Sequence, residues 1–200
     1  MTANTELGTL YEVDLVSGIA TPDCSAPSGG LTDIAFGPDG TLYATTFTSL
    51  FSMARDTCAG TVVASTGGNS LDVAEDGVIY GGVGSTIFAF NRGDGTIITV
   101  ATVPSGYTLS GDIAFLGTQL YGTVGTGSGN DFLAAFDLAT TRGRIVGDTG
   151  QRCVYGLTSL EPSSLYGLTC DGFVIRIEPG TGTSSVLWRT EIPFFGAASQ

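Results

Sequence analysis

The sequence predicts an all-β protein made of repeats, and three observations carry this prediction. A phrase of two short strands joined by a turn occurs five times, anchored on Leu10, Leu50, Ile87, Leu133 and Val174. A second hairpin, which ends in an apolar residue followed by tyrosine, lies between successive copies of the phrase. No stretch carries a convincing helical pattern. A period of about 40 residues that consists of strands and turns alone is typical of a β-propeller blade.

Each predicted blade has four antiparallel strands. The inner two form the hairpin between the repeated phrases, where alternating apolar residues and a Gly, Asp or Pro turn indicate paired strands. These inner hairpins begin at Leu31, Ser70, Ser110 and Val154. The outer two strands come from the repeated phrase itself.

The sequence holds five outer hairpins but only four inner ones. The regular spacing between them places the missing inner strands near Ala197 and near Thr2, at the two ends of the chain. We therefore predict a five-bladed β-propeller, a single domain over residues 1–200, whose fifth blade is shared between about 1–21 and 193–200. Strands from both termini would close the ring and remove an exposed edge. Self-assembly into a filament, by docking of 193–200 into a neighbouring copy, is the alternative, but the ends of one chain meet at a higher effective concentration.

Composition excludes more chemistry than any motif suggests. The chain has no histidine, and all seven basic residues are arginine, so Ser-His-Asp systems, histidine-bound metals and catalytic lysines are excluded. A net charge of −12 opposes binding to nucleic acid and to anionic membranes. No apolar run approaches the length of a membrane span, and no signal peptide is evident at the start. Carboxylate chemistry, thiol chemistry or no catalysis remain.

The four cysteines are predicted to form two disulfides. Cys153 and Cys170 flank one inner hairpin, and equal counting outward from a turn that pairs Leu160 with Ser163 places them opposite each other. Cys24 and Cys58 then pair by remainder. Two buried free thiols are the alternative for Cys153 and Cys170. Paired cysteines indicate an oxidising compartment, and hence an extracellular or cell-surface location.

Three acidic residues open successive inner strands at Asp33, Asp72 and Asp112, whereas Gly156 takes this place in the fourth hairpin. Inner strands of a propeller line its central channel, and converging carboxylates would suit Ca²⁺. A structural role is favoured, because an aspartate at this place also accepts hydrogen bonds from nearby backbone N–H groups. The sequence therefore predicts no cofactor, and Ca²⁺ is the alternative.

The phrases DIAFGPDGTLYATT and LYEVDLVSG resemble those of secreted bacterial propeller repeat proteins, within the broader NHL-like and gluconolactonase-like group. The resemblance covers nearly the whole chain and implies the blade. Gluconolactonase-like enzymes hold a catalytic metal in the channel with carboxylates and an amide. No Glu, Asn and Asp set in this sequence can be matched to theirs.

The sequence therefore favours a non-catalytic extracellular module, structural or for recognition, in a surface or secreted assembly. The expected partner is a protein or a carbohydrate. Two alternatives stay open. One is a calcium-dependent, lactonase-like hydrolase that uses the channel carboxylates. The other is a lectin with sugar pockets between the blades.

Overall fold

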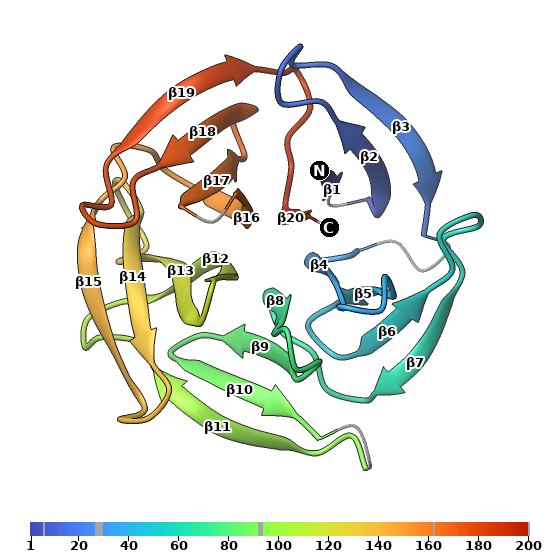
Figure 1. The fold of residues 1–200 in the computed structure, drawn as a ribbon, viewed down its shortest axis with the longest axis horizontal. Coiled ribbons are helices and arrows are strands. Elements are labelled where there is room, and N and C mark those ends of the chain that lie inside the picture. The colour runs from blue at the N-terminus through green and yellow to red at the C-terminus, as the bar shows by residue number, and fades with distance from the viewer. Residues whose placement is uncertain (6, 27–29, 92–93, 162, 200) are drawn as a thin grey trace.

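The computed structural model describes residues 1–200 except 6, 27–29, 92–93, 162 and 200, and the described residues form twenty strands and no helix. The strands follow one another around a ring, and both chain ends lie near its centre (Figure 1). Each unit of the ring consists of four strands, ordered below from the innermost to the outermost. No helix among the described residues has the length and apolar character needed to cross a membrane.

The first unit combines both ends of the chain. It has the strand order β20-β1-β2-β3, from β20 (Gly196–Ala198), β1 (Thr2–Asn4), β2 (Thr9–Val13) and β3 (Ala20–Ser25). The second unit is a four-stranded sheet of β4 (Asp33–Phe36), β5 (Leu42–Thr45), β6 (Leu50–Met53) and β7 (Gly60–Ala64).

The next two units share one eight-stranded sheet. One contains β8 (Ser70–Val73), β9 (Ile79–Val83), β10 (Thr86–Phe90) and β11 (Ile97–Thr102). The other contains β12 (Thr108–Leu116), β13 (Gln119–Gly125), β14 (Phe132–Asp137) and β15 (Arg142–Asp148). A single parallel pair, Thr102 with Arg142, joins their outermost strands β11 and β15. The last unit is β16 (Val154–Glu161), β17 (Ser164–Thr169), β18 (Phe173–Ile177) and β19 (Ser184–Arg189).

The two termini pair as the spacing predicts. Strand β20 runs antiparallel to β1, with Thr2 opposite Ala198 and Asn4 opposite Gly196. The pairing gives the N-terminal strands an inner neighbour, so the unit has the same four-stranded form as the others. Phe194, just before β20, is fully buried against the N-terminal unit and its neighbour.

Apolar clusters fill the spaces between neighbouring units. For example, Leu10 and Ala198 of the first unit pack with Ile34 and Leu42 of the second. Among the described residues there are five such clusters, each with side chains from two units that are adjacent in the ring. Each unit is therefore buried on both of its faces, which explains why its middle strands are apolar on both sides.

Both predicted disulfides are present. Cys24 of β3 bonds to Cys58, in the turn between β6 and β7, with Cα atoms 5.8 Å apart, and so links the first unit to the second. Cys153 bonds to Cys170 across the β16–β17 hairpin, with Cα atoms 5.6 Å apart.

The predicted pairing of the β16–β17 hairpin was wrong at its turn. Glu161 pairs with Ser164, in place of Leu160 with Ser163. Two register irregularities along the hairpin then shift the pairing back, so that Val154 lies opposite Thr169. The cysteines meet because these shifts cancel the offset at the turn, which counting along the sequence had no means to show.

Candidate functional site

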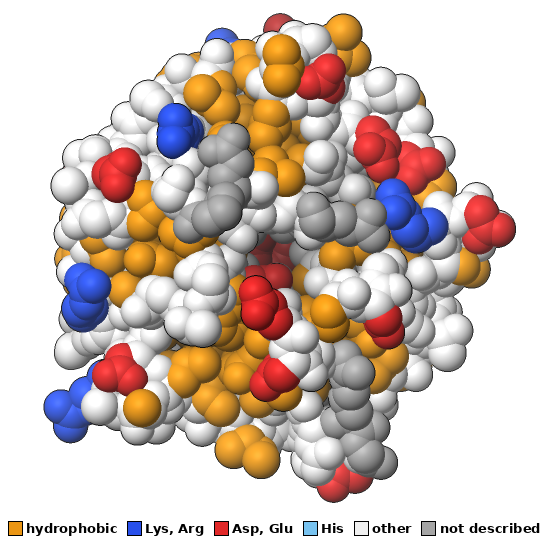
Figure 2. Space-filling model, in the orientation of Figure 1, with side chains coloured by type: hydrophobic (Ala, Val, Ile, Leu, Met, Phe, Trp, Pro, Cys, Tyr) orange, Lys and Arg blue, Asp and Glu red, His pale blue; other side chains and the backbone are white. Residues whose placement is uncertain are grey.

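The five innermost strands surround the axis of the ring, and the centre of the face shown in Figure 2 is hollowed and bordered by acidic side chains. At the C-terminal ends of these strands lies a small polar hollow of about 230 Å³. Asp72, Glu75, Ser159 and Ser199 contribute its polar groups, and Phe36 and Phe115 its rings. A larger hollow lies at the opposite ends of the same strands.

The three aspartates predicted as metal ligands connect neighbouring units. Each accepts one hydrogen bond from the backbone N–H of the following residue and a second from the inner strand of the next unit. The second donors are Leu71 to Asp33 at 2.7 Å, Phe115 to Asp72 at 2.6 Å, and Leu157 to Asp112 at 2.8 Å. These carboxyl groups therefore satisfy buried backbone donors at three consecutive seams of the ring.

Burial changes the protonation of these groups. Desolvation raises the pKa of Asp112 to about 8 and that of Asp72 to about 7. The pKa of Asp33 is raised well above its usual value, first by burial and then by the nearby charge and hydrogen bond of Asp112. Asp33 and Asp112 are both fully buried, and two ionised carboxylates so close together repel, so a proton shared between them is favoured near neutral pH.

The structure does not bring all three aspartates together as one ligand set. Among the described residues, their carboxylate oxygens do not lie within 4.8 Å of one another as a group of three. The residues that do meet this distance are Cys153, Cys170 and Asp171, whose sulfur atoms are bonded to each other. Calcium binding at Asp33, Asp72 and Asp112 stays a prediction.

Asn4 is a channel residue that sequence reasoning missed. It is fully buried, and its Nδ2 donates to the backbone oxygen of Leu31, whereas its Oδ1 has no hydrogen-bond donor among the described residues. A Cβ on Gly196 would overlap both Oδ1 of Asn4 and Oδ1 of Asp33, so the two oxygens face the same small space. No repeat pattern marks Asn4, because it lies on β1, in the unit that the C-terminal strand β20 completes.

The larger hollow lies at the N-terminal ends of the inner strands and measures about 660 Å³. Its described lining carries no charged side chain and includes Leu31, Phe47, Val83, Leu109, Tyr155 and Phe195. Phe47 is 66% exposed and Val83 is 44% exposed, although both are apolar. Tyr155 and Phe195 lie 5.3 Å apart between ring centroids and form one wall. Sequence reasoning missed this hollow because its residues come from several different repeats, and no local pattern shows that they meet.

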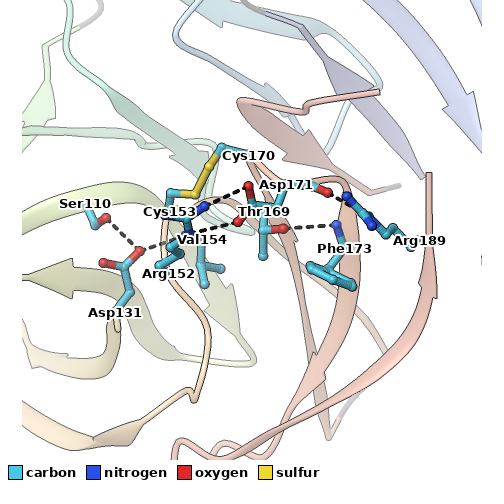
Figure 3. The surroundings of a disulfide bond; sticks show 10 residues. All are labelled: Ser110, Asp131, Arg152, Cys153, Val154, Thr169, Cys170, Asp171, Phe173 and Arg189. Carbon is cyan, nitrogen blue, oxygen red and sulfur yellow. Dashed lines mark hydrogen bonds and ion pairs between the residues drawn. A yellow bond between two sulfur atoms is a disulfide. The ribbon is translucent and has the colours of Figure 1, made fainter. Parts of the chain in front are cut away.

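A second hollow of about 490 Å³ adjoins the first and shares Thr108, Leu109, Ser110 and Tyr155 with it. Its polar groups include Asp131 and Arg152, and the Cys153–Cys170 disulfide forms part of its wall. Figure 3 shows Oδ2 of Asp131 between Ser110 and Val154, with hydrogen bonds of 2.7 Å from Ser110 Oγ and from Val154 N. Arg152 is paired with both oxygens of Asp171, at 2.9 and 3.2 Å.

Comparison with known proteins supports the fold class. No protein-family model matches the chain. No curated protein matches it either. Solved structures of β-propeller proteins do match it in shape.

A chain in the crystal structure of a nidogen/laminin complex has a TM-score of 0.67 at 16% identity, covering 95% of this chain and 76% of that one. A gluconolactonase from Xanthomonas campestris has a TM-score of 0.66 at 14% identity, and the match covers 98% of this chain and 78% of that one. TolB from Acinetobacter baumannii has a TM-score of 0.58 at 16% identity, and the match covers 94% of this chain and 52% of that one. At these identities the likeness shows the fold alone, which is that of the β-propeller class.

Proposed function

We propose that the protein is a five-bladed β-propeller that acts as a non-catalytic recognition module outside the cytosol. Counting each four-stranded unit as a blade divides the eight-stranded sheet into two blades, since their strands pair with each other at a single parallel residue pair among the described residues. The two disulfides favour an oxidising, extracellular or cell-surface setting. The partner is a protein, bound at the uncharged hollow of about 660 Å³.

The observation that carries this proposal is the exposure of Phe47 and Val83 on the rim of that hollow. Exposed apolar side chains around a concave site, with a wall formed by Tyr155 and Phe195, are typical of binding surfaces. The surrounding scaffold is rigid, because the units are joined by apolar clusters and buried carboxyl groups, and two of them by the Cys24–Cys58 disulfide. Loops on a rigid scaffold are the usual place for recognition.

Nuclear magnetic resonance with a library of small apolar fragments tests the proposal. Fragments are expected to shift the amide signals of Phe47, Val83, Leu109 and Tyr155, and Phe47→Ser is expected to weaken these shifts. Val62→Ser is a matched control, because Val62 is 57% exposed on the outer strand β7, away from the hollow. Fragment shifts that fall elsewhere on the ring, or that Phe47→Ser leaves unchanged, would contradict the proposal.

A second candidate, a calcium-dependent hydrolase, is favoured by one observation. The unpartnered Oδ1 of Asn4 lies beside Asp33 in the channel, and amide and carboxylate oxygens are ligands that Ca²⁺ prefers. Against it, the backbone N–H groups of Ile34 and Leu71 already use both oxygens of Asp33. Isothermal titration of the metal-free protein with CaCl₂ tests the site. Binding that Asn4→Ala and Asp33→Asn both abolish would favour this candidate, and no binding at millimolar Ca²⁺ would exclude it.

A further inference from the structure

Asp131 is a nearly buried carboxylate with one free oxygen. The residue is only 6% exposed, yet it lines the hollow of about 490 Å³. Both hydrogen bonds that its carboxylate accepts among the described residues, from Ser110 and Val154, go to Oδ2. In Figure 3 its other oxygen points away from these donors. This oxygen is open to the hollow, and a cationic ligand there would bind it through a charge-assisted hydrogen bond.

Gly125 keeps this oxygen accessible. A Cβ at Gly125 would lie 2.7 Å from Oδ1 of Asp131, closer than real Cβ contacts come. The backbone of Gly125 is not in the left-handed region, so its conformation does not require glycine. Space next to the carboxylate is therefore the physical reason for glycine at this position.

The charges near Asp131 favour a cation over an anion. Arg152 is the basic residue in the described lining of this hollow, and its guanidinium is already bound to both oxygens of Asp171. The whole chain carries a net charge of −12, which attracts cationic ligands to the surface. Burial raises the pKa of Asp131, and a cationic ligand would favour its ionised form. Because Arg152 is already paired with Asp171, the ionised carboxylate of Asp131 is the charge in the described lining that a cationic ligand would neutralise.

The adjoining hollow supplies an apolar subsite. It shares Ser110 and Tyr155 with the hollow of Asp131, and its described lining has no charge. Together the two hollows, of about 660 and 490 Å³, exceed the range of roughly 300–1,000 Å³ that is typical for drug-sized molecules. An extended peptide, whose side chains project at regular intervals, fits this size better than a single small molecule does.

We propose that the two hollows form one bipartite site for an extended peptide segment of a protein partner. A basic side chain binds Oδ1 of Asp131, and a nearby apolar side chain occupies the hollow beside Phe47, Tyr155 and Phe195. This inference rests on the proposed function and specifies the chemistry of the partner. Tyr155 lies between the two subsites and contacts both parts of the ligand.

Fluorescence anisotropy with labelled hexapeptides tests the inference. The panel carries one arginine and one phenylalanine, separated by zero to two residues, with matched peptides in which citrulline replaces arginine or alanine replaces phenylalanine. Citrulline keeps the shape of arginine and removes its charge. At least one arginine–phenylalanine peptide is expected to bind the folded protein, and either replacement is expected to weaken binding about tenfold.

Protein variants separate the two subsites. Asp131→Asn keeps an acceptor for Ser110 and Val154 but removes the charge, so it should weaken the arginine peptide about tenfold and leave the citrulline peptide unchanged. Gly125→Ala should also weaken the arginine peptide, because its Cβ obstructs Oδ1. Asp137→Asn is the control, since it removes the same charge from an exposed turn outside both hollows.

The outcomes distinguish this inference from the proposed function. If Phe47→Ser weakens peptide binding while Asp131→Asn and Gly125→Ala do not, the recognition hollow stands and the cation subsite is wrong. If Asp131→Asn and Asp137→Asn weaken binding equally, general electrostatic attraction is responsible and the subsite is again wrong. If no peptide of the panel binds at millimolar concentration, the bipartite site is refuted, whereas fragment binding at Phe47 still decides the proposed function independently.

Discussion

The buried carboxyl group of Asp112 is expected to make the protein less stable as the pH rises from about 4 to 8. Burial raises the pKa of Asp112 to about 8, whereas the ordinary value is 3.8. Between these values the folded chain keeps a proton that the unfolded chain has lost. The stability contribution of this group is therefore fully present below pH 4 and is lost as the pH rises through 8.

The structure gives the order of magnitude of this effect. A tenfold change in the proton dissociation constant corresponds to ~1.4 kcal/mol, so Asp112 alone changes the free energy of unfolding by ~6 kcal/mol across this range. Asp72, whose pKa burial raises to about 7, acts in the same direction. The exposed residues Asp94 and Asp137 have lowered pKa values, so their contribution is lost only at acidic pH. The chain has no histidine to titrate in this window.

Urea denaturation at pH values from 5 to 9 is the assay. The wild-type free energy of unfolding should fall from pH 5 to about 8 and level off above that. Asp112→Asn should flatten the profile, because an amide has the shape of the protonated carboxyl and does not ionise. Asp112→Ala should be destabilised at every pH, since it leaves the N–H groups of Ile113 and Leu157 without acceptors, at a cost of ~1–3 kcal/mol each.

Two results would refute this reasoning. A wild-type profile that is flat or that rises between pH 5 and 8 would show that the carboxyl ionises as easily when folded as when unfolded. A slope that Asp112→Asn leaves unchanged would assign the pH dependence to other groups. Comparison with Asp137→Asn, an exposed aspartate on a turn, controls for the change in net charge.

Three further predictions concern the closure of the ring. Deleting 193–200 should cost several kcal/mol, roughly 2–3 of them from Phe194 alone, and an unchanged melting temperature would count against closure by β20. Replacing Cys24 and Cys58 with serine should lower the free energy of unfolding by ~4 kcal/mol, whereas opening the hairpin disulfide should lower it by ~3 kcal/mol. The first loss is larger because Cys24 and Cys58 are separated by 34 residues in the sequence, and the cysteines of the hairpin by 17. Hydrogen exchange in that double variant should rise first in 2–21 and 193–200, and an even rise around the ring would contradict the idea of a clasp. Gly196→Ala should destabilise the protein by more than 1 kcal/mol in thermal denaturation, because its Cβ meets the oxygens of Asp33 and Asn4, and a stable variant would show that the channel has room there.

The outer and inner hairpins were predictable because they depend on local patterns. Alternating apolar residues and turn residues specify short antiparallel strands, and a repeat near 40 residues specifies how often they recur. The same count located the strand near Ala197 that pairs with Thr2–Asn4. Counting outward from the predicted turn placed Cys153 opposite Cys170, although the turn itself was displaced and two register shifts restored the pairing.

The site depended on contacts that no local pattern encodes. Sequence reasoning found Asp33, Asp72 and Asp112 as a series that holds nearby backbone N–H groups, but it had no means to show that each one also reaches the inner strand of the next unit. Neither Asn4 nor Asp131 recurs at the matching position of another repeat, so spacing gave no reason to single them out.

The sequence by itself determined the strands, their turns, the ends that close the ring and the chemistry that the missing histidine and lysine exclude. The tertiary structure decided where loops from different repeats meet. Phe47 and Phe195 line one hollow although they lie far apart in the chain, and the free oxygen of Asp131 is accessible because Gly125 on a neighbouring strand has no side chain. The repeated sequence pattern reflects the burial that all repeats share, whereas a binding site consists of residues at which the repeats differ.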